Sequence, residues 1–232
     1  GIEMMLAVDV SNSRLAQDFE PSRLERTKFA IDRLTQQLEQ DRIGLIVFAG
    51  DAYMQLPITS DYVAARSFAA QISPTMVSKQ GTAIGAAIDL AANSFSSGSE
   101  GSRVIVVISD GENHEDDALA AAKAAAEKGI RIYTIGIGTP EGAPISIDGE
   151  FIKDEQGDMV VSKLDEQMLE QIALTTGGAY IRATNRSLGL DEIVQKINEV
   201  EKKELTSTVF EDFNEQYQYL IGLALALLLL EF

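Results

Sequence analysis

Three short polar segments carry side chains suited to binding a divalent cation. Asp9-Val-Ser-Asn-Ser13 supplies a carboxylate and two hydroxyls, Gly81-Thr82 supplies a third hydroxyl, and Asp110 supplies a second carboxylate. Oxygen donors of this kind are hard ligands, which favour Mg²⁺, Mn²⁺ or Ca²⁺ over soft metals. We therefore predict one metal site formed by Asp9, Ser11, Ser13, Thr82 and Asp110.

The segments fall at the boundaries of predicted elements. Apolar runs at Met4–Val8 and Val104–Ser109 end at Asp9 and Asp110, and Thr82 precedes an alanine-rich helical segment. In open α/β sheets, ligands bind beyond the carboxyl ends of the strands. Short polar runs also form ordinary turns and helix caps, but three segments in this context favour a metal site over capping alone.

The rest of the sequence predicts the scaffold that brings these segments together. Apolar runs predict strands at Met4–Val8, Ile43–Ala49 and Val104–Ser109. Further strands are predicted at Arg131–Ile137 and Ala179–Arg182, and Tyr53–Ile58 can return beside the second strand as a hairpin. Helical spacing predicts helices at Pro21–Gln40, Asp61–Ile72, Ala83–Phe95, Asp116–Lys128, Leu164–Thr176 and Leu190–Lys203. This alternation is typical of a doubly wound, Rossmann-like α/β fold, with a mostly parallel sheet and helices on both faces. Residues 145–161 alternate apolar and polar side chains around two turns, which predicts a small β-hairpin insertion.

Composition excludes several classes of function. The formal net charge of −17 disfavours nucleic acid and anionic lipid surfaces as partners. The chain has no cysteine and a single histidine, His114, so disulfides, thiolate sites and multi-histidine zinc sites are impossible. We interpret His114 as an exposed residue without a role, the alternative being a pH-sensitive contact at the rim of the site. Asp148, Asp154 and Asp158 are consistent with a second calcium loop, but they fit ordinary turn chemistry equally well.

The pattern D-x-S-x-S, then T, then D resembles the metal-ion-dependent adhesion site of von Willebrand factor A (VWA) domains. That resemblance implies that Ser11 and Ser13 bind the ion directly, and that Asp9 and Asp110 act directly or through water. It also implies that Thr82 engages the ion when the site is ready for its ligand. Two aspartates roughly neutralise a divalent ion, and neutral hydroxyls leave it electrophilic, so an Asp or Glu of a partner protein can complete its coordination.

A narrower resemblance covers nearly the whole chain. The segments Asp9–Ser13, Pro21–Lys28, Ser109–Glu115 and Thr175–Tyr180 are similar to those of aerotolerance-type bacterial membrane proteins (Bat, BatA- and BatB-like). The resemblance implies a VWA domain between transmembrane helices, with other VWA membrane proteins and a MoxR-type AAA+ ATPase system as associates. Arg14 departs from the pattern, because an apolar residue, often methionine, is expected there.

We predict a VWA domain over residues 1–203, a juxtamembrane linker over 204–216, and the start of a truncated transmembrane helix over 217–232. Residues 217–230 are uncharged and leucine-rich. They are shorter than the roughly 20 residues that a membrane span needs, so a buried terminal helix is the alternative. The linker contains acidic residues and no Lys or Arg, which favours the non-cytoplasmic side of a bacterial inner membrane, the periplasm.

The predicted function is a non-enzymatic, cation-dependent protein-binding module. The alternative is a magnesium-dependent phosphatase with Asp9 as nucleophile, but that pattern requires an acid two residues later, where Ser11 stands. The sequence has no G-x-S-x-G nucleophile elbow and no P-loop, which disfavours a serine hydrolase and ATP hydrolysis. Gly136–Gly142 is a poor match to a dinucleotide fingerprint, because its third glycine comes one residue late.

Overall fold

The computed structural model describes residues 1–96, 101–113, 115–147 and 149–211. Six strands form the main sheet, and four two-residue strands form two small pairs beside it. The main strands are β1 (Glu3–Asp9), β2 (Arg42–Phe48), β3 (Ala52–Thr59), β4 (Arg103–Ser109), β5 (Arg131–Gly136) and β10 (Tyr180–Arg182). The α-helices are α1 (Arg23–Thr35), α2 (Tyr62–Ala70), α3 (Ile84–Ala92), α4 (Ala118–Glu127), α5 (Glu166–Thr175) and α6 (Leu190–Glu211). Two short 3-10 helices, η1 (Asn12–Leu15) and η2 (Pro74–Met76), lie in loops.

The main sheet has the strand order β10-β5-β4-β1-β2-β3. All neighbouring strands are parallel except β3, which returns antiparallel beside β2. The chain moves outward from β1 in one direction through β2 and β3, and in the other through β4, β5 and β10. The switch point between these halves therefore lies where β1 and β4 end, as expected for ligand binding in a doubly wound sheet.

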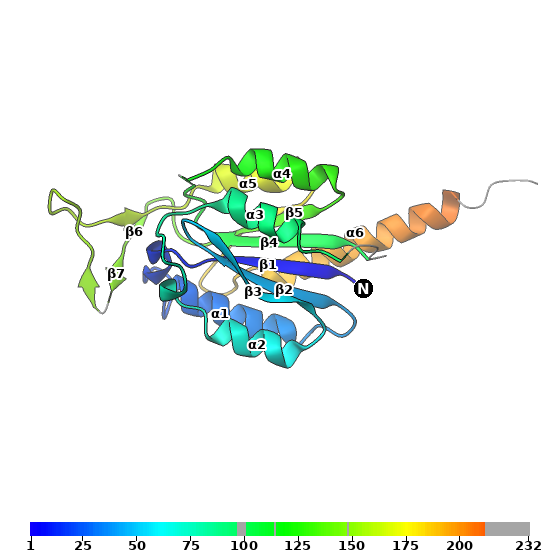
Figure 1. Cartoon of the computed structure of the whole chain (residues 1–232), viewed down its shortest axis with the longest axis horizontal. Helices are drawn as coiled ribbons and strands as arrows, with labels where there is room; N and C mark the ends of the chain where they lie inside the picture. Colours follow the sequence, from blue (N-terminus) through cyan, green and yellow to red (C-terminus); the bar gives the residue numbers. More distant parts are fainter. Residues whose placement is uncertain (97–100, 114, 148, 212–232) are drawn as a thin grey trace, which may run out of the picture. The chain divides into compact units, whose positions relative to one another are not determined.

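Helices cover both faces of this sheet (Figure 1). Met5 and Ala7 of β1 belong to a core cluster with buried residues of α3, α4 and α5. Leu6 and Val8 alternate with them and are equally buried, so they face the side on which α1 and α2 pack. Burial on both faces explains why the strand sequences are continuously apolar.

Several predicted elements are confirmed, with shifts at their ends. The predicted helices around α1, α2, α4 and α5 began too early, because their first residues act as turns or caps. The side chains of Ser22, Asp61, Asp117 and Asp165 accept hydrogen bonds from the first turns of these four helices. At the carboxyl end the prediction for α6 was too short, since no Gly or Pro interrupts the helix between Lys203 and Glu211.

The predicted insertion between β5 and α5 is confirmed in an altered form. β6 (Ala143–Pro144) pairs with β9 (Val161–Ser162), and β7 (Ser146–Ile147) pairs with β8 (Glu150–Phe151). We call residues 143–162 the insertion; it projects from the sheet end at the left of Figure 1. At its tip, the carboxylate of Asp154 accepts hydrogen bonds from the backbone of Gln156 and Asp158, which agrees with a turn.

The chain divides into two compact units, Gly1–Ile193 and Val194–Phe232. The first contains the main sheet, the insertion and every predicted metal ligand. Among the described residues, no helix combines the length and apolar character required to cross a membrane. The predicted membrane segment 217–232 lies outside the described residues, as do His114 and Asp148.

Candidate metal centre

Asp9 and Asp110 reach the same edge of the sheet because β1 and β4 are parallel neighbours. The register pairs Val8 with Ile108, and Asp110 is the first residue after β4. Both aspartates are completely buried. Two carboxylates are therefore held out of solvent at the switch point of the sheet.

Hydrogen bonds fix the Asp9 carboxylate and the loop that follows it. Its Oδ1 accepts from the backbone N–H of Ser11 at 2.9 Å, and its Oδ2 accepts from the Ser109 hydroxyl at 2.7 Å. The hydroxyls of Ser11 and Ser13 lie 2.9 Å apart. The first segment thus presents one carboxylate and two adjacent hydroxyls.

Asp110 is held by residues distant in sequence. Its Oδ2 accepts from the Ser162 hydroxyl at 2.9 Å and from the Arg23 guanidinium at 3.4 Å. Arg23 is itself buried, and it donates from Nε and Nη2 to the two carboxylate oxygens of Asp18, each at 2.8 Å. The insertion and α1 therefore both orient this carboxylate.

The Thr82 segment is attached to the same edge of the sheet by hydrogen bonds. The N–H of Ala83 donates to the carbonyl of Ala49, just after β2, and the N–H of Asn12 donates to Oε1 of Gln80. Gly81 has φ of 117°, a backbone conformation that residues with a Cβ rarely adopt, so glycine is favoured before Thr82. Thr82 itself is 6% exposed.

Two buried carboxylates lie close together in the centre, and nearby positive charge does not fully offset their repulsion. Burial and, to a smaller extent, the nearby charge of Asp110 together raise the pKa of Asp9 from 3.8 to about 6. The charge of Arg14 and the hydrogen bonds from Ser11 and Ser109 act in the opposite direction. A cation placed here would relieve this repulsion.

Arg14 also lies in this environment, completely buried. Burial lowers its pKa to about 10, while Asp9 and Asp110 act to raise it. The guanidinium therefore remains protonated at neutral pH. Sequence reasoning singled out Arg14 only as a departure from a pattern.

The donor set fits a hard divalent cation. The structure brings Asp9, Ser11, Ser13 and Asp110 into one linked group and brings the Thr82 segment to the same edge. Sequence reasoning did not identify Ser109, Ser162 or Arg23 as part of this group. The one signal for Arg23 was a basic residue in the first turn of a helix, where the helix dipole disfavours it.

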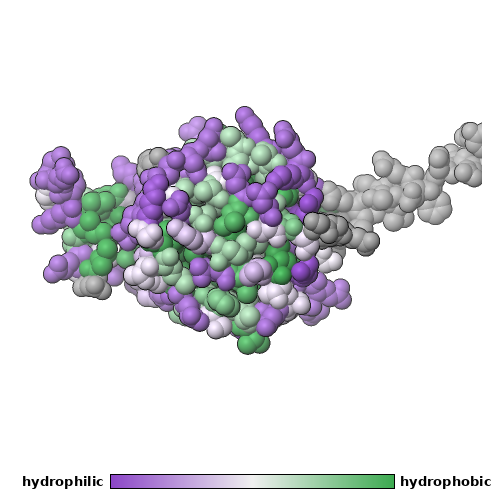
Figure 2. All heavy atoms as spheres, viewed as in Figure 1, coloured by the Kyte–Doolittle hydropathy of each residue, from purple (hydrophilic) through white to green (hydrophobic). Residues whose placement is uncertain are grey.

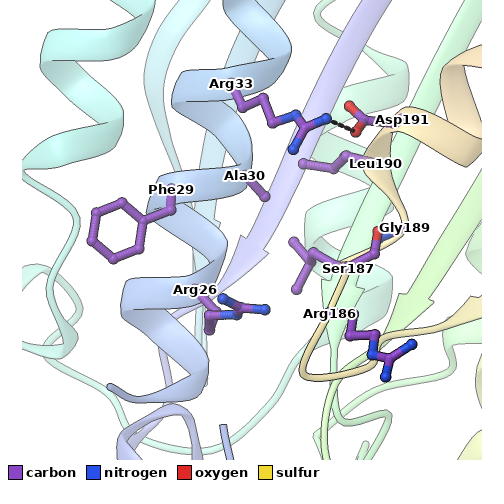
Figure 3. Close-up of a pocket in the computed structure, with 10 residues that line it drawn as sticks. Arg26, Phe29, Ala30, Arg33, Arg186, Ser187, Gly189, Leu190 and Asp191 are labelled. Atoms are coloured by element: carbon purple, nitrogen blue, oxygen red, sulfur yellow. Dashed lines mark hydrogen bonds and ion pairs between the residues drawn. The ribbon is translucent and has the colours of Figure 1, made fainter. Parts of the chain in front are cut away.

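A separate groove of about 330 Å³ lies between α1 and the loop before α6 (Figure 3). Arg26 and Arg33 project from α1 toward this loop, and Arg33 pairs with Asp191 at 3.3 Å. The groove is lined by none of the residues of the candidate centre.

This chain has a doubly wound sheet with aspartates and hydroxyls at its switch point. It therefore falls in the class of α/β domains that bind ligands at the carboxyl ends of the strands. The chain belongs to the von Willebrand factor type A domain family, whose family model matches residues 3–196. The predicted fold class and family are therefore confirmed.

Solved structures with the same architecture include two from Bacteroides. An aerotolerance-related membrane protein from Bacteroides fragilis, with multiple mutations to serines, is 51% identical with a TM-score of 0.82 and covers 86% of this chain and 100% of its own. BatB from Bacteroides thetaiotaomicron is 49% identical with a TM-score of 0.81 and has the same coverage.

Sequence relatives are longer proteins. An uncharacterized protein of Borreliella burgdorferi is 29% identical over all of this chain, which spans 68% of it. A UPF0353 protein of Mycolicibacterium paratuberculosis is 31% identical over 78% of this chain, which spans 55% of that relative.

The fold also occurs at low sequence identity. Proximal thread matrix protein 1 from the mussel byssus, solved with a zinc-occupied MIDAS motif, is 16% identical with a TM-score of 0.63. It covers 86% of this chain and 45% of its own length.

Proposed function

We propose that this domain binds a protein partner through a divalent cation, Mg²⁺ or alternatively Mn²⁺ or Ca²⁺, held by Asp9, Ser11, Ser13, Thr82 and Asp110. The observation that carries the proposal is the placement of two buried carboxylates beside serine hydroxyls at the end of β1 and β4. Hydrogen bonds from Ser109 and Ser162 hold the two carboxylates in place.

The chemistry of the donors supports an ion that can still bind one further carboxylate, from a partner. Two carboxylates match the charge of a divalent cation, while the hydroxyls of Ser11, Ser13 and Thr82 add no charge. The bound ion supplies an electrophilic position, which an Asp or Glu of the partner fills. Replacing Thr82 should weaken binding of the partner more than binding of the ion, because water can replace one neutral metal ligand.

The surface beside the centre supports a protein as the partner. Phe151, Met159 and Val161 of the insertion are 54%, 54% and 44% exposed, and Figure 2 shows an apolar area within the insertion. The insertion is tied to the centre by the bond from Ser162 to Asp110. A partner that reaches the ion with a carboxylate can pack apolar side chains against the same region.

The relatives support a membrane context. A relative 51% identical is described as an aerotolerance-related membrane protein. We propose that residues 217–232 begin a transmembrane helix, that the domain lies in the periplasm of a bacterial inner membrane, and that other VWA membrane proteins and a MoxR-type AAA+ ATPase system act with it.

Metal titration tests the proposal directly. Calorimetry with Mg²⁺ or Mn²⁺ should detect one principal site in the wild-type chain. Asp9→Ala and Asp110→Ala should abolish it, whereas Asp61→Ala, which removes the carboxylate that caps α2, should leave it intact. Unchanged affinity in both site variants would remove the basis for the assignment.

Partner capture tests the role of the ion. Full-length protein should retain its partner from membrane extracts in Mg²⁺ and release it in EDTA. Thr82→Ala should weaken partner binding by about tenfold to a hundredfold, the cost of one charge-assisted contact. Equal binding of the partner in EDTA and by Thr82→Ala would mean that the ion does not bridge the two proteins.

We also propose that the domain is not an enzyme. The Asp9 carboxylate is buried, and both of its oxygens accept hydrogen bonds, which is unfavourable for a nucleophile. Purified protein should not hydrolyse phosphate esters. Metal-dependent hydrolysis that disappears in Asp9→Asn would favour the phosphatase alternative.

A further inference from the structure

Arg14 is a buried cation with an incomplete set of hydrogen bonds. It lies in η1, directly after Ser13, and is 0% exposed. Its Nη2 donates to the Thr27 hydroxyl at 2.7 Å, but in the described part of the chain Nε and Nη1 have no hydrogen-bond partner. Burying a guanidinium in this way is costly, so a compensating interaction is needed.

The compensation comes from the charges of the centre. Arg14 interacts electrostatically with both Asp9 and Asp110. Arg23 also approaches Asp110, but its charge is already matched by its two hydrogen bonds to Asp18. With Arg23 and Asp18 cancelling, Asp9, Asp110 and Arg14 give the centre a formal charge of about −1 rather than −2.

We propose that Arg14 is a built-in counter-charge that weakens binding of a divalent cation alone and strengthens binding of a carboxylate ligand to the cation-loaded centre. This inference rests on the proposed function of the same centre. A divalent ion brings the centre from about −1 to about +1, and a partner carboxylate then brings it to neutrality. With a neutral residue at position 14, the ion alone would reach neutrality, and the carboxylate would add an unbalanced negative charge.

The consequence is that ion and partner bind cooperatively. The bound ion leaves a positive charge that favours the partner carboxylate, and the carboxylate in turn favours the ion. The coupling is reciprocal by thermodynamic linkage. The centre would then hold its ion firmly only when an acidic ligand is present. Arg14 acts here through its charge.

The test is a metal titration of folded variants. Arg14→Met should bind Mg²⁺ about tenfold more tightly or better than wild type, because the removed charge lies in a poorly screened interior. Arg14→Lys retains the charge and should remain close to wild type. Arg33→Met is the matched control. It removes the same charge from a side chain that is 71% exposed, where solvent screens it. Circular dichroism and urea unfolding in EDTA establish that each variant is folded.

A second titration measures the coupling with acetate as the carboxylate probe. At constant ionic strength, acetate should tighten Mg²⁺ binding more in wild type than in Arg14→Met. Equal or weaker Mg²⁺ affinity in folded Arg14→Met, or equal gains from acetate, would overturn the role of Arg14 and leave the metal site standing. Absence of Mg²⁺ binding in both wild type and Arg14→Met would instead overturn the proposed function.

Discussion

Asp9 carries its carboxylate at the end of β1, where it is buried and feels the charge of Asp110. These two effects raise its pKa to about 6, although two hydrogen bonds and Arg14 favour its ionised form. The protein without metal therefore keeps Asp9 ionised at neutral pH at a cost in stability. A bound cation would offset this cost.

That cost has a definite pH dependence in EDTA. Between the unfolded pKa near 3.8 and the folded pKa near 6, the folded protein holds a proton that the unfolded chain has lost. The contribution of Asp9 to stability is therefore fully present below about pH 4 and is lost as the pH rises through about 6. Asp9→Asn should remove this dependence, on the order of 1–3 kcal/mol, in urea unfolding at about pH 4.5 and 7.5.

Wild type and Asp9→Asn must be compared as a difference, because other carboxylates titrate in the same window. Asparagine preserves an acceptor for the N–H of Ser11, so the loop should survive the substitution. Parallel stability profiles for the two proteins would contradict the idea that Asp9 carries the shifted pKa.

At the scale of single residues, the sequence predicts the candidate metal ligands better than the residues that hold those ligands in place. Asp9 and Asp110 follow apolar runs, so local sequence alone indicates strand-end positions. Ser162 cannot be assigned in the same way, because it reaches Asp110 from a two-residue strand 52 positions later. The burial of Arg14 could not be predicted from the sequence either, since a charged residue in a loop is ordinarily expected at the surface.

At the scale of elements, the loop after β4 caps a helix other than its own. The carboxylate of Asp116 accepts from the N–H groups of Gly85 at 3.0 Å and Ala86 at 2.7 Å, and Oδ1 of Asn113 accepts from the N–H of Ile84. The start of α3, next to Thr82, is thereby attached to the segment next to Asp110. Asp117 caps α4 through the N–H of Ala120 at 3.0 Å.

Asp116→Ala and Asp117→Ala form a matched pair that separates these two roles. Each should cost about 1 kcal/mol of unfolding free energy through loss of a cap. Only Asp116→Ala should speed amide hydrogen exchange over residues 82–86, because of these two aspartates it is Asp116 that bonds the first turn of α3. The same exchange rates in both variants would show that the capping bonds do not hold the Thr82 segment.

The elements themselves were largely predictable, for a physical reason. A parallel sheet buried on both faces requires continuous apolar strands, and helices packed on it require one apolar face. Asp116 shows the limit of this reasoning: the sequence places it at the start of the following helix, whereas its carboxylate binds across to α3. Caps that cross between elements depend on tertiary structure, which periodicity does not contain.

At the scale of the whole molecule, the net charge of −17 and the candidate centre act in different ways. The overall charge attracts cations and basic surfaces over a range set by ionic strength, about 8 Å at physiological salt. Recognition of a partner Asp or Glu must therefore occur at short range, through the ion.

Residues Gly1–Ile193 form one compact unit, so a chain ending at Asn214 should keep the urea midpoint of the full sequence. It should also scatter less light at high concentration, because it lacks the uncharged leucine-rich residues 217–230. A chain ending at Gly189 is the control: it loses Leu190 and Ile193, which are 2% and 0% exposed, and should lose about 3 kcal/mol or more. If the chain ending at Asn214 instead loses cooperative unfolding, the terminal apolar segment belongs to the core of the domain, and the membrane assignment fails.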